Sequence, residues 1–428
     1  MKIIADLQIH SRFSRATSSS INLPNLEKYA KLKGLNLLGT GDFTHPKWLA
    51  ELKNELKEDG SGILTSKSGF HFALQGEISN IYTQDGKARR IHTLLLAKNF
   101  DVVEQINAAL LKRGRLDYDG RPIFGFSCIE LVEMMKEIDD SIEIIPAHAW
   151  TPWYGIFGSM SGFDSVEECF KEQSKHIYAI ETGLSSDPAM NWRLSKLDKY
   201  TLVSSSDAHS YWPWRLGREC NIFDIDWSYD ELLNAIRKRK GFVETIEMWP
   251  HEGKYHYSGH RACDVCLSPK ESLKLKDVCP KCRRKLTVGV AERVEELADR
   301  PEGFVPKNFV PFKNLIPLSE VIAVITGHAV SSKQVWEEYY KLINAFGNEF
   351  EVVLNAEEKE IKKITSEKIA GNIIRNRNQK IPFKPGYDGV YGVPMFDDKD
   401  VEYKDEKIKN LEQNHEIKNK QKGLDEFL

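Results

Sequence analysis

Short apolar runs alternate with amphipathic stretches through the first 245 residues, and this alternation restricts the fold more than any other feature. The apolar runs, which we expect to be strands, are residues 1–6, 35–39, 72–75, 93–97, 143–146, 177–180 and 200–203. Amphipathic helices are expected at 26–33, 47–57, 102–112, 128–138 and 229–238. Repeated strand–helix–strand order predicts an α/β domain built on a parallel sheet or barrel, with a site at the carboxyl ends of its strands.

Five of the twelve histidines lie at the ends of apolar runs, beside carboxylates. They are His10, His45, His92, His148 and His209, and the companion residues are Gln8, Asp42, Glu77 and Asp207. Imidazole nitrogens and carboxylate oxygens on one face of a strand suit zinc, manganese or iron. A carboxylate between two metals can bridge them. We therefore expect a divalent-metal site bridged by Glu77, the alternative being that these are ordinary core histidines.

Four of the seven cysteines form two Cys-x₂-Cys pairs, Cys263 with Cys266 and Cys279 with Cys282, with twelve residues between the pairs. This spacing predicts a tetrahedral zinc ion held by four thiolates, which is structural because no coordination position stays open. Basic residues interleaved with Tyr255 and Tyr257 surround the pairs. They indicate either a contact with a phosphate backbone or an ordinary solvated face. The net charge of −3 means that nucleic-acid binding would depend on such a local patch.

Changes in composition along the chain suggest four parts. They are a metal-dependent domain over 1–245, a zinc-binding domain over 246–290, a mainly helical domain over 291–397 and a flexible, highly charged tail over 398–428. The chain has no run of 18 apolar residues, and its first residues do not have the pattern of a signal peptide. We therefore expect a cytoplasmic protein, and a monomer is the simplest expectation.

The order of the metal motifs resembles the polymerase-and-histidinol-phosphatase (PHP) family. The matching strings are DLQIHS at 6–11, TGDFTH at 40–45, Glu77, His92, PAH at 146–148 and SDAH at 206–209. The resemblance implies a distorted (β/α)₇ barrel that hydrolyses phosphate esters with two or three divalent metals (Zn²⁺, Mg²⁺ or Mn²⁺). It implies that Asp207, Glu77, His10 and His148 are the catalytic residues. Gln8 and Phe43 stand where the family usually has histidine, which leaves the number and identity of the metals open.

Longer strings extend the resemblance to the whole chain. The strings GKYHY at 253–257, RVEELADRPEG at 293–303, ETGLSSDP at 181–188 and WPWR at 212–215 resemble the endonuclease Q family. That resemblance implies a DNA-repair endonuclease that cuts 5′ of deaminated bases (uracil, hypoxanthine, xanthine) and of abasic sites. Such an enzyme must extrude the damaged nucleotide into a pocket. Candidate DNA- or base-binding residues are Trp153, Tyr154, Glu181, Ser185, Arg193, Arg215, Tyr387 and Tyr391.

The last eight residues resemble the short box that docks on PCNA-type sliding clamps, which would point to an archaeal source. Gln421, Leu424, Phe427 and Leu428 have its spacing, and the three apolar side chains would share one side of a helical turn. Three other interpretations stay open: a phosphatase of small phosphate esters, an inactive metal-binding module that docks on DNA, and a 3′–5′ exonuclease.

Overall fold

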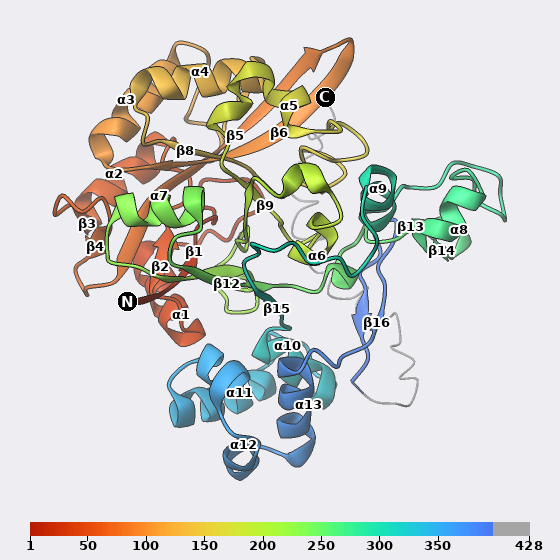
Figure 1. Ribbon diagram of the computed structural model, residues 1–428. Coiled ribbons are helices and arrows are strands. Elements are labelled where there is room, and N and C mark those ends of the chain that lie inside the picture. The colour runs from red at the N-terminus through yellow and green to blue at the C-terminus, as the bar shows by residue number, and fades with distance from the viewer. Residues whose placement is uncertain (397–428) are drawn as a thin grey trace. The chain divides into compact units, whose positions relative to one another are not determined.

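An eleven-stranded mixed sheet lies at the centre of the computed structural model, which describes residues 1–396 (Figure 1). Its main path runs β15–β12–β11–β1–β2–β5–β4–β3, and β6, β7 and β8 branch from this path. The strands are β1 (Lys2–Asp6), β2 (Leu37–Gly39), β3 (Leu56–Lys57), β4 (Leu64–Ser66), β5 (His71–Gln84), β6 (Lys87–Ala97), β7 (Ile123–Phe124), β8 (Glu143–Pro146), β11 (Cys220–Asp224), β12 (Phe242–Glu247) and β15 (Phe312–Asn314). All of these strands belong to the compact unit Met1–Pro394.

The sheet is mixed, whereas the strand–helix alternation predicted parallel strands. Strands β1, β2 and β5 run parallel, but β11 is antiparallel to both β1 and β12. Strands β5 and β6 form one long antiparallel hairpin, because Asp85 and Gly86 both adopt positive φ angles (53° and 74°) at its tip. Two such residues make the tight turn that suits a hairpin. A separate parallel pair consists of β9 (Ala179–Glu181) and β10 (Thr201–Val203).

Helices cover this sheet. They are α1 (Leu23–Lys33), α2 (Pro46–Glu55), α3 (Phe100–Leu111), α4 (Cys128–Ile138), α5 (Val166–Phe170), α6 (Pro188–Asn191) and α7 (Tyr229–Lys238). All of these except α5 and α6 lie close to where the periodicity predicted a helix. The predictions for 128–138 and 229–238 are confirmed to the residue. Helix α4 begins at a capping box, in which Ser127 and Glu130 each satisfy a backbone N–H of the other. Helix α3 packs beside α4 and along β6 (Figure 1).

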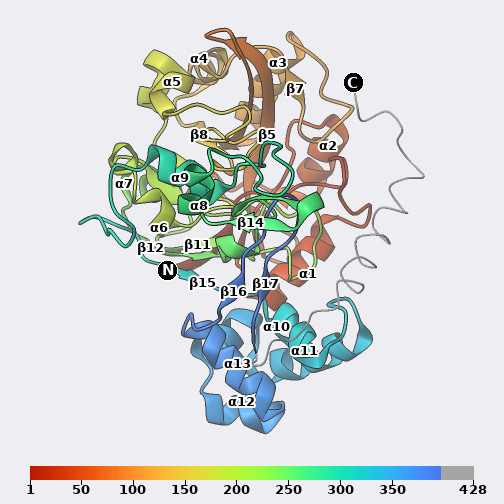
Figure 2. The ribbon, with the colours of Figure 1, turned by 90° about the vertical axis from the view of Figure 1, so that its right-hand side faces the viewer.

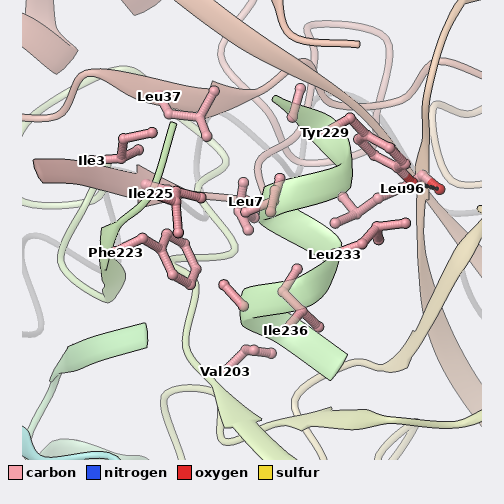
Figure 3. Packing of buried hydrophobic residues seen from close by; sticks show 14 of the residues in the cluster. Ile3, Leu7, Leu37, Leu96, Val203, Phe223, Ile225, Tyr229, Leu233 and Ile236 are labelled. Atoms are coloured by element: carbon pink, nitrogen blue, oxygen red, sulfur yellow. Dashed lines mark hydrogen bonds between the residues drawn. The ribbon is translucent and has the colours of Figure 1, made fainter. Parts of the chain in front are cut away.

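The apolar face of α7 forms one side of the main core cluster (Figure 3). Leu232, Leu233 and Ile236 pack with residues of β1 and β11, and Phe223 is fully buried among them. The Tyr229 hydroxyl donates to the backbone oxygens of Leu96 and Ser141, each at 2.9 Å. The buried hydroxyl is therefore satisfied, and α7 is held against the sheet by both packing and hydrogen bonds.

The cysteine-containing segment forms a small substructure that follows β12. It consists of β13 (Ser258–His260), β14 (Val265–Leu267), α8 (Pro269–Lys274) and α9 (Val290–Leu297), around a minor core of Val265, Cys279 and Leu286. Short 3₁₀ helices occur at Lys171–His176, Ser195–Leu197, Pro250–Glu252 and Arg261–Cys263. The chain then returns to the main sheet, because β15 pairs in parallel with β12.

Four helices follow β15 and pack against one another (Figures 1 and 2). They are α10 (Leu318–Thr326), α11 (Lys333–Phe346), α12 (Glu358–Ile364) and α13 (Glu367–Arg377), with a π-helical turn at Glu351–Asn355. A final hairpin joins β16 (Phe383–Lys384) to β17 (Val393–Pro394). Buried Lys33 of α1 reaches Glu349, with its ammonium 2.7 Å from the carboxylate. Within residues 1–396, every helix is too short or too polar to span a bilayer.

Candidate active site

Two groups of side chains that could hold a metal ion lie on strands or in the segments that follow them. The first group is His10, Asp207 and His209, whose ligand atoms all lie within 4.8 Å of one another. His10 follows β1, and its backbone N–H donates to the Ala208 oxygen at 3.0 Å. This bond joins the segment after β1 to the segment after β10. The two sequence motifs that contribute the first group are therefore paired directly through the backbone.

The second group is Glu77, His92 and His148, which are all buried. Glu77 and His92 lie on the long hairpin of β5 and β6, and His148 follows β8. The Nδ1 atom of His92 lies 2.9 Å from Glu77 Oε1 and 3.1 Å from His148 Nε2. The other ring nitrogen of His148 bonds the Thr151 hydroxyl at 2.9 Å. Such a bond fixes the orientation of a metal-binding imidazole.

Glu77 lies between the two groups. Its Oε2 atom lies 3.0 Å from His10 Nε2, whereas its Oε1 atom faces His92. One carboxylate thus presents one oxygen to each group. A carboxylate in this arrangement can bridge two metal ions.

The backbone is strained at three of the motif residues. Asp42, His148 and Asp207 have φ angles of 42°, 32° and 48°. These angles fall in the left-handed region, which residues other than glycine seldom adopt. Gly183 makes room for His148, because a β-carbon at position 183 would lie 2.6 Å from the His148 α-carbon. Residues held in such conformations are concentrated at active sites and ligand clamps.

Buried atoms of the first group and of nearby Gln8 fit a metal ion. Within the described residues, Gln8 Oε1, His10 Nε2 and Asp207 Oδ1 are buried and lack a hydrogen bond. His10 Nε2 lies 3.1 Å from Asp207 Oδ1. Buried oxygen and nitrogen atoms are costly unless they are satisfied, and a divalent cation satisfies several at once. Gln8 also donates to Glu77 Oε2 at 3.1 Å, so it supports the bridging carboxylate.

Electrostatics favour the protonation states that bind metals. Burial disfavours a charged Glu77, but the nearby Arg121 and hydrogen bonds from His10 and His148 outweigh burial and hold the pKa of Glu77 well below its usual range. Burial and the nearby Arg121 together lower the pKa of His92 to about 3. Glu77 is therefore a carboxylate and His92 a neutral imidazole, and these are the forms that act as ligands.

Asp42 and His45, both predicted as ligands, lie outside the two groups. Asp42 Oδ1 lies 2.9 Å from His10 Nδ1, and its Oδ2 accepts bonds from the Ser11 backbone and the Ser14 hydroxyl. Asp42 thus orients His10, because hydrogen-bonded neighbours occupy both of its oxygens. The ring of His45 instead stacks on Phe13, with centroids 4.3 Å apart.

Phe43 packs against Gly76 at the position where the family pattern has a histidine. A β-carbon on Gly76 would lie 3.1 Å from the buried ring of Phe43. The phenyl ring therefore occupies space beside β5, and it offers no ligand atom.

Sequence reasoning missed one residue of the site. Arg121 lies in the loop before β7, and its Nη1 atom is 3.4 Å from Glu77 Oε1. Gly120 lets this loop approach, because a β-carbon there would lie 2.2 Å from Asp42 Oδ2. A single arginine in a loop carries no motif, so only the adjacent Asp119-Gly120 turn could have drawn attention to it.

The cysteine cluster differs from the predicted set of four thiolates. The structure brings together Cys263, Cys279, Cys282 and His260, with His260 Nδ1 3.2 Å from Cys282 Sγ. Cys266 is exposed on β14 and lies outside this group. Neighbouring residues of a strand point to opposite faces, and Val265 faces the small core. Cys266 therefore faces away from the cluster. His260 lies where the cysteine spacing had predicted Cys266.

Two of the predicted DNA contacts are used inside the protein. The Arg193 guanidinium lies 2.6 Å from a Glu295 oxygen. Tyr387 is only 8% exposed, and its hydroxyl donates to Asp264 at 2.6 Å. The Tyr387 ring also packs closely against Gly259.

Other candidates lie nearer to the metal groups or at the surface. The Tyr154 ring stacks on His92 at 4.3 Å, and Trp153 packs edge-on against Tyr255 at 5.6 Å. Glu181 accepts the backbone N–H of His148 at 2.7 Å, and burial raises its pKa well above the usual range. Tyr391 is 45% exposed, with the Lys254 ammonium 4.4 Å from its ring centre. Ser185 and Arg215 are half-buried.

Sequence comparisons connect this chain with uncharacterised proteins. A family model described as the MJ0043 C-terminal domain matches residues 317–380. The uncharacterised protein MJ0043 of Methanocaldococcus jannaschii is 33% identical over 314 residues, which are 70% of this chain and only 37% of that protein's length. The uncharacterised protein YqxK of Bacillus subtilis is 28% identical over 411 residues, covering 91% of this chain and 98% of that protein.

Solved structures match over almost the entire chain. The lesion-specific endonuclease PfuEndoQ of Pyrococcus furiosus superposes with a TM-score of 0.84 at 32% identity, covering 96% of this chain and 99% of that one. An endonuclease Q in complex with a 27-mer duplex that carries an abasic lesion gives a TM-score of 0.83 at 31% identity, over 95% and 100% of the two chains. Because fold and sequence agree over nearly the full length of both chains, this chain belongs to the endonuclease Q family.

Proposed function

We propose that this protein is a metal-dependent DNA-repair endonuclease that cuts 5′ of deaminated bases (uracil, hypoxanthine, xanthine) and of abasic sites. The cut leaves a 3′-hydroxyl and a 5′-phosphate. The position of Glu77, with one oxygen directed to each ligand group, carries the proposal, because paired metals suit the hydrolysis of phosphodiesters. The match to an endonuclease Q crystallised on abasic DNA supports the choice of substrate.

Two catalytic ions fit the donor groups. His10, Asp207 and His209 would hold one, and Glu77, His92 and His148 would hold the other. Bound divalent ions supply Lewis acidity, which lowers the pKa of water toward about 7 and neutralises charge on the phosphate. The protein's own part is to fix these ligands. Asp42 orients His10 and Thr151 orients His148 through their second ring nitrogens.

The cysteine cluster is proposed to hold a structural zinc ion. Three thiolates and one imidazole complete a tetrahedral set and leave no open position. The module would present its surrounding lysines and arginines to the phosphate backbone. The clamp-binding box at Gln421, Leu424, Phe427 and Leu428 lies outside the described residues, so docking on a sliding clamp stays a proposal from the sequence.

The proposed function is tested on end-labelled duplexes that differ at one position. The bases compared are cytosine, uracil, adenine, hypoxanthine and an abasic residue, each with Mg²⁺, Mn²⁺ or chelator. A single metal-dependent nick 5′ of the altered position is expected. A ladder from the ends would indicate an exonuclease instead, and release of phosphate from small esters without any cut in DNA would indicate a phosphatase.

A further inference from the structure

The mouth of the metal site is formed by a few partly exposed side chains. His10, Asp42 and Glu77 have fully buried side chains, whereas Asp207 and Arg121 are each 26% exposed and His209 is 33% exposed. The side chains of Asp207, His209 and Arg121 therefore line the side of the ligand groups that faces solvent. Of these three, Arg121 alone carries a permanent positive charge.

Arg121 is held at this mouth by its loop. Its backbone N–H donates to the Asp119 carboxylate at 3.1 Å. The backbone oxygen of Pro122, the next residue, accepts from the Ser79 N–H at 3.0 Å. These bonds fix the loop alongside β5, two residues beyond Glu77. The arginine therefore has a defined place and does not depend on a flexible surface loop.

The contact between Arg121 and Glu77 is long for an ion pair inside a protein. The Nη1 to Oε1 distance is 3.4 Å, whereas charge-assisted bonds are usually about 2.7–2.9 Å. Glu77 Oε1 also faces His92 and His148. An arginine side chain has five N–H donors and cannot bind a metal ion. The Arg121 guanidinium can therefore bind a second anion that approaches it from solvent.

We propose that Arg121 directly binds a non-bridging oxygen of the scissile phosphodiester and stabilises the charge that develops there during cleavage. The inference deepens the proposed function, since it names the residue of the same site that receives the phosphate. A guanidinium gives two parallel N–H bonds to a phosphate, which a lysine cannot reproduce. Donors aimed at developing charge are worth more in a site that excludes water.

The alternative role is structural: Arg121 could serve only to hold Glu77. The two roles differ in what their loss does to the metals. If Arg121 only held Glu77, its removal would release metal ions from the site. If it binds phosphate, metal content stays at the wild-type level while the rate falls.

The test uses the full chain loaded with Mn²⁺ and three variants: Arg121→Gln, Arg121→Lys and the matched control Arg115→Gln. Arg115 lies in the same loop, is exposed, and pairs only with nearby Asp117 among the described residues. Metal content is measured by mass spectrometry. Single-turnover cleavage of abasic duplex and hydrolysis of bis(p-nitrophenyl) phosphate are measured separately.

We expect Arg121→Gln to keep its metals and to lose about 10²–10³-fold in rate on both substrates, as removal of one oxyanion donor does. Arg121→Lys should recover part of the loss, and Arg115→Gln should match the wild type. Loss of metal from Arg121→Gln, or an unchanged rate, would overturn the inference. If the wild type hydrolyses the small diester but cuts no DNA, the proposed function is overturned. The role of Arg121 is then still tested by comparing the variants on the small diester.

Discussion

The buried ion pair between Lys33 and Glu349 gives the sharpest prediction about stability. Their side chains are 2% and 1% exposed, and the charged atoms are 2.7 Å apart. Glu349 also accepts bonds from the Leu318 backbone and the Tyr339 hydroxyl. Replacing Lys33 with methionine keeps the apolar stem but leaves the Glu349 carboxylate buried without its counter-ion.

The expected loss is about 3–5 kcal/mol of unfolding free energy, the usual result of removing one partner from a buried pair. Lys31→Met in the same helix is the control. Lys31 is 52% exposed and pairs with Glu27 four residues earlier, so its loss should be about 0.5 kcal/mol or less. Adding Glu349→Gln to Lys33→Met removes the stranded charge, and should restore most of the stability.

Urea unfolding followed by tryptophan fluorescence measures these differences. The rings of Trp212 and Trp336 lie 5.2 Å apart. Trp212 belongs to the segment after β10 and Trp336 to α11, so tryptophan fluorescence reports when the C-terminal helices separate from that segment. A Lys33→Met variant as stable as Lys31→Met would refute the reasoning. So would a double variant less stable than the single one.

Three further predictions concern the metal sites and pH. Asp207→Asn should keep the fold but lose a catalytic metal and all measurable cleavage; retained activity in a metal-loaded variant would contradict its role. His260→Ala should lose the structural ion, whereas Cys266→Ser should keep it. With Co²⁺ in place of zinc, the visible spectrum of the wild type should show three sulfur ligands and one nitrogen ligand, not four sulfur ligands. Burial raises the pKa of Glu247 to about 8, so its neutral form favours the folded state. Stability from this group should be complete below about pH 4.5 and lost as pH rises to about 8, and Glu247→Gln should flatten this part of the urea-derived stability profile.

Local patterns predicted the helices and the metal motifs well. The helix at 128–138 has both a capping box and a continuous apolar face, so its limits follow from nearby residues. Glu77, His92 and His148 stood out because ligand residue types at strand ends are unusual. Both signals are short in range and need no knowledge of the rest of the fold.

Features that depend on distant contacts were missed. Strands 72–75 and 93–97 were expected to be short, but they belong to a hairpin of 14 and 11 residues, because the polar residues around its tip hid the Asp85-Gly86 turn. Arg121 reaches Glu77 only through the packing of its loop along β5. His260 lies with Cys263, Cys279 and Cys282, whereas Cys266 is exposed, because β14 points successive side chains to opposite faces. A count of residues between cysteines does not reveal this.

The central claim is tested most directly on a covalently closed circular duplex that carries one uracil, compared with the same circle carrying cytosine. A closed circle has no ends, so only an endonuclease can convert it to the open form. We predict that the wild-type protein with Mn²⁺ opens the uracil circle alone, at one position 5′ of the uracil, and that Asp207→Asn opens neither. Equal opening of both circles, or none by the metal-loaded wild type, would contradict the account.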